Sequence, residues 1–218
     1  MMKLSVVMTL IAGGMLLASA EMQEGVWNNH FDYLVRSVQA TLRFKKSSTY
    51  YHSNQLHICK KVYAKQPIVT GLDSLMRFGN CNITSDTIQS NVTFKYILRF
   101  ELFAIAFPKL IVDGVVMSAY MRVKNVIINM SHTLYIQRHP KVKVNEINLI
   151  AFSGIEFATS KPEHDVLVKD GEFLIGVAQK ISDRLQLMQP MIEDYLTLFY
   201  MKLGGYIEPE KDVPQKLA

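Results

Sequence analysis

Alternation of apolar and polar side chains through the middle of the chain constrains the fold more than any other feature. Residues 56–159 lack the helical spacing of apolar side chains. Two runs alternate most clearly, namely Val92, Phe94, Tyr96, Leu98 and Val115, Met117, Ala119, Met121, Val123. A period of two places these side chains on one face of a strand. The residues between the runs break strands: Pro67, Gly71, Gly79, Asn80, Ser85, Asp86, Pro108, Asp113, Gly114, His139, Pro140 and Gly154.

This pattern predicts an antiparallel meander of strands of about eight to twelve residues, joined by short turns. Such a sheet is apolar on one face and needs a cover. A helical pattern precedes it in residues 26–42, where Phe31, Leu34, Val38 and Leu42 follow one another at steps of 3, 4 and 4. Asn28 or Asn29 can serve as the N-cap of this helix.

A second helical pattern follows the sheet in residues 172–203. Its apolar side chains recur at steps of 3 and 4 from Val177 to Leu203, without a break at Pro190. The unbroken register predicts one long helix kinked near Pro190, or two nearly collinear helices. Gly204 and Gly205 then form a C-cap signal.

The first twenty residues have the layout of a secretory signal peptide. Lys3 precedes an apolar run over residues 4–17, and a small-residue cleavage site follows at residues 18–20. A membrane anchor is the competing interpretation, but the run is shorter than the roughly 18 to 20 residues that span a bilayer. We therefore expect a secreted, extracellular protein with one domain at residues 21–205 and a flexible tail at residues 206–218.

Secretion changes how cysteines and asparagines are interpreted. Only Cys59 and Cys81 are present, and in an oxidising compartment one disulfide between them is the default, with two unpaired thiols as the alternative. Asn82, Asn91 and Asn129 each begin a glycosylation sequon, and we expect Asn91 and Asn129 to be the preferred sites. The net charge of +5 is spread without a block of like charges, so the sequence does not favour a nucleic-acid partner.

Catalytic and metal-binding patterns are absent or weak. The sequence has no HExxH, GxSxG or CxxC motif and no phosphate-binding glycine loop in the mature chain. The six histidines, at positions 30, 52, 57, 132, 139 and 164, are interpreted as scattered surface residues. We therefore predict no enzyme activity, no catalytic or metal-ligating residues and no cofactor.

What remains is a surplus of apolar side chains between the sheet and the helices. Each of them can belong to a packed core, but aromatic and methionine side chains also suit the walls of a lipophilic cleft. The residues expected to line such a cleft are Leu34, Val38, Phe94, Tyr96, Phe103, Met117, Met121, Ile181 and Leu185.

Residues 68–84 resemble a strand motif of the arthropod group-7 allergen-like secreted proteins. The residues that carry the match are Gly71, Leu72, Leu75, Arg77, Gly79 and Asn80. These proteins are relatives of the juvenile-hormone-binding and takeout-like carriers, in the tubular lipid-binding superfamily that includes bactericidal/permeability-increasing protein. The hormone-binding and takeout branch usually has a disulfide near the mature N-terminus, and the lack of a cysteine before Cys59 favours the group-7 branch.

The resemblance implies an α+β fold in which a long curved antiparallel sheet wraps around a long amphipathic helix, as in half of a bactericidal/permeability-increasing-protein-like super-roll. We predict a carrier of a hydrophobic small molecule or lipid. Innate recognition of bacterial lipid at a membrane or bacterial surface, a secreted hydrolase with an unrecognised site, and a structural or salivary protein without a ligand remain as alternatives.

Overall fold

The computed structural model describes residues 20–44, 49–51, 55–86, 90–136, 139–164 and 171–203. The predicted signal peptide apart from Ala20, the predicted C-cap and the predicted tail lie outside these residues. The helices are α2 (Ala20–Phe44), η1 (Leu72–Ser74), η2 (Pro162–His164) and α4 (Gly171–Leu203). The strands are β1 (Tyr50–Tyr51), β2 (Gln55–Cys59), β3 (Val62–Lys65), β4 (Ile68–Thr70), β5 (Leu75–Asp86), β6 (Asn91–Phe100), β7 (Phe103–Val112), β8 (Val115–Tyr135) and β9 (Lys141–Thr159).

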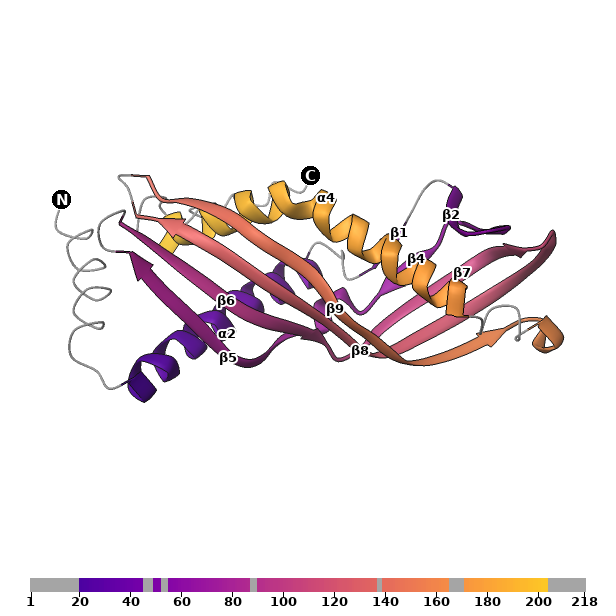
Figure 1. Ribbon diagram of the computed structural model, residues 1–218, viewed down its shortest axis with the longest axis horizontal. Helices are drawn as coiled ribbons and strands as arrows, with labels where there is room; N and C mark the ends of the chain where they lie inside the picture. The colour runs from indigo at the N-terminus through magenta and orange to yellow at the C-terminus, as the bar shows by residue number, and fades with distance from the viewer. Residues whose placement is uncertain are drawn as a thin grey trace, which may run out of the picture.

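The strands form one antiparallel sheet, as predicted, and with the helices they give an α+β fold (Figure 1). Strand β8 is its axis. Phe100 of β6 faces Val126 and Phe103 of β7 faces Val123, so β6 and β7 follow one another along the same side of β8. Strand β9 pairs with the other side of β8, and β3, β4 and β5 pair with the far side of the β6 and β7 line.

Strands β8 and β9 have 21 and 19 residues, so the predicted length of eight to twelve residues was wrong for them. Six predicted breakers lie within strands: Gly79, Asn80, Ser85 and Asp86 in β5, Pro108 in β7 and Gly154 in β9. Pro108 is at a register irregularity of β7, Gly79 at one of β5, and Gly154 is in β9 with a φ of 69°. At Gly79 and Pro108 a bulge accommodates the residue without ending the strand, because the pairs on either side hold. The predicted turn at Asp113 and Gly114 is confirmed between β7 and β8, with positive φ at both residues.

The alternation is interrupted at the same level of the sheet in three segments, namely the connection between β6 and β7, strand β8 and strand β9. In each segment two successive residues lie between inward-facing apolar neighbours: Glu101 and Leu102, Lys124 and Asn125, Ser153 and Gly154. We call these six residues the bend line. Because side chains alternate strictly in a regular strand, the double step shifts the buried parity of β8 from odd positions, ending at Val123, to even positions, starting at Val126. The sheet curves along its length (Figure 1).

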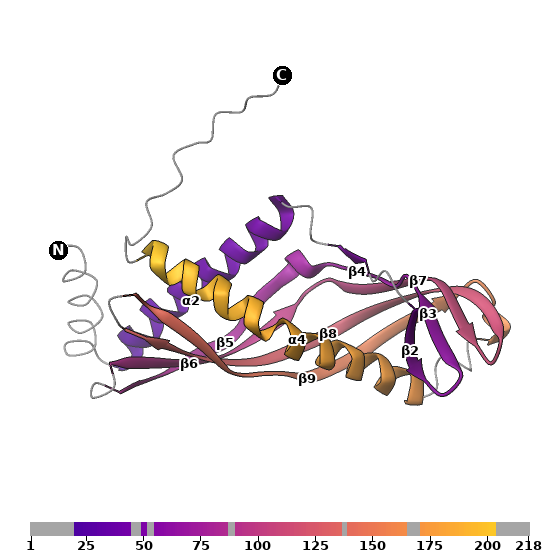
Figure 2. The ribbon, with the colours of Figure 1, turned by 90° about the horizontal axis from the view of Figure 1, so that it is seen from above.

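The two long helices lie over the same, inner face of the sheet (Figure 2). From α2, Phe31 packs its ring against those of Phe94 and Tyr96 on β6. Helix α4 runs along β9, and its N-terminal Phe173 meets Phe107 and Phe157. The predicted register across Pro190 is confirmed, because α4 is continuous there. Within the described residues, no helix combines the length and apolar character needed to cross a membrane.

Helix α2 begins earlier than predicted. It starts at Ala20, so Asn28 and Asn29 lie inside it and neither is an N-cap. Asn28 has another role, since its side-chain oxygen accepts a hydrogen bond from the backbone N–H of Cys81 at 3.0 Å. Its amide nitrogen donates to Asn80 at 3.2 Å. The helix is thereby joined to β5.

Candidate functional site

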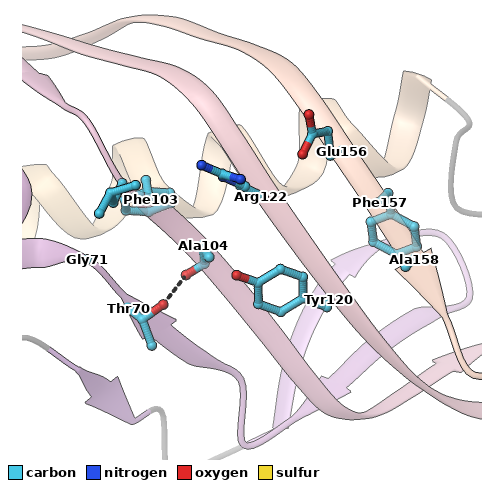
Figure 3. A pocket seen from close by; sticks show the side chains of 10 residues that line it. Thr70, Gly71, Phe103, Ala104, Tyr120, Arg122, Glu156, Phe157 and Ala158 are labelled. Carbon is cyan, nitrogen blue, oxygen red and sulfur yellow. Dashed lines mark hydrogen bonds between the residues drawn. The ribbon is translucent and has the colours of Figure 1, made fainter.

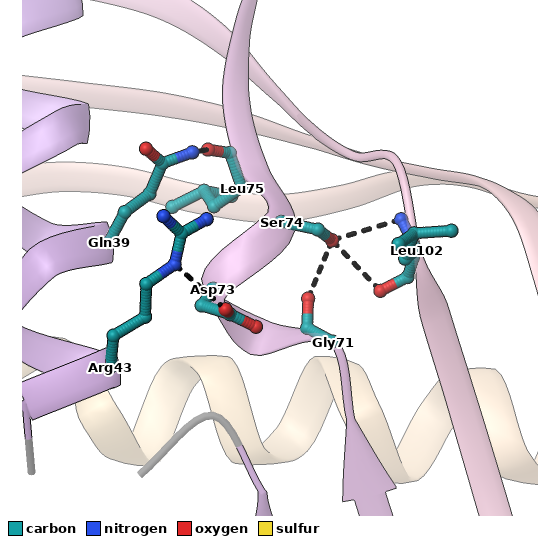
Figure 4. A network of polar contacts seen from close by, with 7 residues as sticks. All are labelled: Gln39, Arg43, Gly71, Asp73, Ser74, Leu75 and Leu102. Carbon is teal, nitrogen blue, oxygen red and sulfur yellow. Dashed lines mark hydrogen bonds and ion pairs between the residues drawn. The ribbon is translucent and has the colours of Figure 1, made fainter. Parts of the chain in front are cut away.

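The motif that carries the family resemblance holds α2 against the sheet. Gly71 has a φ of 80°, and a Cβ there would lie 1.6 Å from the carbonyl oxygen of Leu102. The Ser74 hydroxyl donates to the carbonyl of Gly71 at 2.6 Å and accepts from the N–H of Leu102 at 3.0 Å (Figure 4). The Arg77 guanidinium donates two hydrogen bonds, of 2.9 and 3.1 Å, to the carboxylate of Asp32 on α2.

Two further contacts extend this attachment toward the end of α2. Gln39 donates to the carbonyl of Leu75 at 2.7 Å, and Arg43 pairs with Asp73 at 3.0 Å (Figure 4). The paired hydrogen bonds from Arg77 to Asp32 fix the orientation of the two side chains as well as stabilising the contact. The motif therefore sets how α2 sits on the inner face, and hence the space beside it.

Eight of the nine residues predicted to line a cleft lie in or against the core, and Val38 on α2 is the exception. Six of them are buried: Leu34, Phe94, Tyr96, Phe103, Met117 and Met121. The other three, Val38 on α2 and Ile181 and Leu185 on α4, are half-buried. The buried residues mainly pack against one another, and the half-buried ones come from the two helices. Their role in binding stays a prediction.

The helices touch near one end of the inner face. The hydroxyls of Ser37 on α2 and Tyr195 on α4 are 3.2 Å apart, and the rings of Tyr33 and Phe199 meet at 5.9 Å. From there α2 continues over β5 and η1, and α4 continues along β9 toward β2. The two helices diverge in this direction (Figure 2).

Below the helix contact lies a polar chain in the core. His132 on β8 is fully buried, which corrects its prediction as a surface histidine. Its Nδ1 is 3.2 Å from the Tyr96 hydroxyl and its Nε2 is 3.1 Å from the Tyr200 hydroxyl. Burial lowers the pKa of His132 to about 3, and His30 adds to the shift. A neutral imidazole has one donor and one acceptor, so one tyrosine donates to it and the other accepts.

The predicted disulfide is wrong, because Cys59 and Cys81 are not joined. Cys59 is in β2 and Cys81 in β5, with β3, β7, β8 and β6 between those strands in the sheet. Neighbouring strands are about 4.8 Å apart, and β2 and β5 lie at opposite ends of the molecule (Figure 1). A disulfide needs Cα atoms within about 7 Å. Cys81 is buried, which raises the pKa of its thiol to about 12.

The three sequons differ in exposure. Asn82 in β5 is exposed, whereas Asn91 in β6 and Asn129 in β8 are half-buried. The amide of Asn129 donates to Glu146 at 3.1 Å. The order of exposure is thus opposite to the predicted order of preference, and glycosylation itself stays a prediction.

A pocket of about 600 Å³ lies beside the bend line (Figure 3). Of the nine predicted lining residues, it includes Phe103 alone. Its walls are Thr70, Gly71, Leu102, Phe103, Ala104, Tyr120, Arg122, Glu156, Phe157 and Ala158. Tyr120 and Arg122 are exposed and alternate with the buried Met121, so the pocket opens on the outer face of the sheet, opposite the helices.

The sequence alone does not reveal this pocket. Tyr120 and Arg122 were visible only as the outward positions of an alternating strand. The register of the strands creates the site, because it aligns Thr70, Ala104, Arg122 and Glu156 across four strands. That alignment depends on pairings between residues far apart in the chain. Among the described residues, no cluster of three or more His, Cys, Asp or Glu side chains could hold a metal ion.

Comparisons with known proteins give little beyond the geometry. No protein-family model matches the chain, and no curated protein matches it. Among solved structures, the chain is similar to the crystal structure of Takeout 1 from Epiphyas postvittana. The two share 11% sequence identity with a TM-score of 0.31, over 70% of this chain and 74% of that one. A similarity this low transfers neither the fold nor a ligand.

Proposed function

We propose that the chain is a secreted, non-catalytic carrier of a hydrophobic small molecule or lipid, held on the inner face of the sheet between α2 and α4. The observation that carries this proposal is the set of half-buried apolar side chains where the helices diverge. On α4 these are Ile181 and Leu185, and on β9 they are Phe152 and Ile155. Val38 of α2 belongs to the same class.

Half-buried apolar side chains on an inner face favour a ligand that completes their burial. Removing apolar surface from water contributes about 25 cal/mol per Å², or about 0.8 kcal/mol per methylene. An acyl or terpenoid chain laid along these side chains would gain micromolar affinity without any polar anchor. The motif resemblance of residues 71–80 to lipid-carrier families supports the same function.

A filling substitution tests the location of this ligand. Leu185→Trp would occupy the space beside α4, whereas Leu187→Trp adds the same side chain on the outer side of that helix, where Leu187 is 70% exposed. Delipidated protein with a fluorescent fatty acid should lose at least about fivefold in affinity in the Leu185→Trp variant only, an amount that corresponds to about 1 kcal/mol. Absence of uptake by the parent protein, or equal effects of the two substitutions, would reject the proposal.

Secretion rests on the sequence of residues 1–20. Expression of the whole chain in a secreting eukaryotic cell should release a protein that begins at Glu21, as N-terminal sequencing or intact mass would show. Retention in the cell with Met1 still present would contradict this part of the proposal.

A further inference from the structure

The outer-face pocket is built from two rows of side chains that cross the sheet. One row is Thr70, Ala104, Arg122 and Glu156, and the neighbouring row includes Ala106, Tyr120 and Ala158. Ala104 lies between Thr70 and Arg122 in the first row, and Ala106 and Ala158 lie on either side of Tyr120 in the second. Because a methyl group is short, the alanines leave the hollow between the longer neighbours, and Ala104 forms its floor at 7% exposure.

Three hydrogen-bond donors surround this floor. Figure 3 shows the Tyr120 hydroxyl directed toward Ala104, Thr70 on the other side of Ala104, and the Arg122 guanidinium nearby. The Thr70 hydroxyl is 3.5 Å from the carbonyl of Ala104, a long contact that a ligand could replace. Glu156 is on β9, one strand farther from Ala104 than Arg122 on β8.

The charges around the pocket leave Arg122 available. Within the described part of the chain, no carboxylate lies within ion-pair distance of Arg122. Glu156, its cross-strand neighbour, pairs instead with Lys124. Lys124, which hydrogen-bonds to the Glu156 carboxylate, and Arg122 both lower the pKa of that carboxyl group. The local sum of Arg122, Lys124 and Glu156 is therefore one positive charge, so the pocket attracts an anion.

We propose that this pocket binds an amphiphile with one anionic head group, carboxylate or phosphate, seated over Ala104 between Arg122, Thr70 and Tyr120. A guanidinium presents paired donors that match either oxyanion. The apolar body of the ligand lies against the Tyr120 ring and Leu102, which are 50% and 58% exposed. The volume of about 600 Å³ falls in the range of small-molecule sites, roughly 300 to 1,000 Å³. This site is separate from the inner-face site proposed above.

Calorimetric titration with decanoate, decyl phosphate and uncharged decanol tests the pocket. Arg122→Gln should weaken binding of the anions by at least about fivefold, because a charge-assisted hydrogen bond is lost. Lys95→Gln removes the same charge from an exposed position on β6, outside the pocket lining, and should change nothing. A loss confined to decanoate identifies a carboxylate ligand, a loss confined to decyl phosphate identifies a phosphate ligand, and decanol should not discriminate between the variants.

Backbone amide shifts give the location independently. Decanoate or decyl phosphate should move the resonances of Ala104 and Ala158 in the parent protein and not in Arg122→Gln. Binding that Leu185→Trp abolishes and Arg122→Gln leaves intact would overturn the outer site while keeping the inner-face function. Loss of decanol binding together with anion binding in Arg122→Gln would overturn it too, since that outcome indicates damage to the fold.

Discussion

Gly71 has a backbone conformation and a surrounding that suit no other residue. Its φ of 80° is left-handed, and the carbonyl of Leu102 occupies the place of a Cβ. We expect Gly71→Ala to lower the free energy of unfolding by about 2 kcal/mol or more, because the substitution adds a clash to the conformational cost. Gly114→Ala is the matched control, since Gly114 has a φ of 83° and open space around it.

Urea unfolding should separate the two glycine variants. Gly114→Ala carries only the left-handed cost, about 1 kcal/mol. Equal losses in the two proteins would show that the contact between Gly71 and Leu102 is not needed for the fold.

His132 makes stability depend on pH. Its pKa is about 3 in the folded protein and 6.5 at its ordinary value. Between these two pH values the unfolded chain binds a proton that the folded chain does not, so the free energy of unfolding falls as pH decreases. The contribution is up to about 1.4 kcal/mol per pH unit. Burial also lowers the pKa of His30, which acts in the same direction.

Urea unfolding at about pH 7.5 and about pH 5 measures this dependence. His132→Gln keeps an amide donor and acceptor between Tyr96 and Tyr200 but cannot titrate. We expect the variant to be less stable at neutral pH and to lose less stability on acidification than the parent. If the parent and the variant lose the same amount, His132 is not the titrating group.

Prediction from the sequence was least accurate for the environment of single residues. The inward positions Phe94, Tyr96, Met117 and Met121 were predicted correctly, because their alternation is local. His132 was placed on the surface because nothing local distinguishes it. Its burial depends on two tyrosines, 36 and 68 residues away in the chain, that satisfy both ring nitrogens. The predicted disulfide was wrong for a related reason, since the spacing of Cys59 and Cys81 in the sequence carries no information on the order of the strands in the sheet.

Helix α4 covers the edge of β9 that no other strand within the described residues pairs with. Strand β9 pairs with β8 on one side, and α4 side chains bond to its other edge. Gln189 donates to the carbonyl of Val144 at 3.0 Å, and Glu193 accepts from the N–H of Val144 at 2.8 Å. Gln186 and Thr197 act in the same way at Ile147 and Val142. These four α4 residues are spaced by 3, 4 and 4 positions, so they form one stripe of the helix.

Glu193→Ala should open this edge. We expect a loss of about 0.5 to 1.5 kcal/mol from the free energy of unfolding and faster hydrogen exchange at the Val144 amide. Asp194→Ala is the control, because Asp194 is exposed and points elsewhere on the helix. The role of the stripe would be disproved by unchanged exchange at Val144, whatever the effect on overall stability.

Both long helices were predictable because their apolar spacing is local and strong. The ends of the helices were less predictable, because α2 starts at Ala20, well before the predicted N-cap at Asn28 or Asn29. The length of β9 was wrong because Gly154 looks like a turn residue in the sequence and is in fact tolerated inside the strand. The bend line has a signal in the amino-acid sequence that predicts its position. Each of its three segments has two residues between inward-facing apolar ones, as in residues 100–103, 123–126 and 152–155.

The whole molecule is a curved sheet with one packed end and one looser region under two diverging helices. In the packed end, the rings of Phe31, Phe94, Tyr96, His132 and Tyr200 meet one another. In the looser region, Ile181, Leu185, Phe152 and Ile155 are only half-buried. This difference between the two regions is the physical basis for proposing a carrier, since a rigid end positions the helices and a loose region accepts a ligand.

Native mass spectrometry of the protein purified from its source without delipidation tests the carrier proposal most directly. We expect a peak heavier than the bare chain and its glycans, which releases a lipid or another hydrophobic molecule on activation. The freed molecule would identify the ligand class, and Leu185→Trp should reduce the heavier peak whereas Leu187→Trp should not. A single peak at the mass of the unliganded protein, together with no uptake of a fluorescent fatty acid, would contradict the proposal.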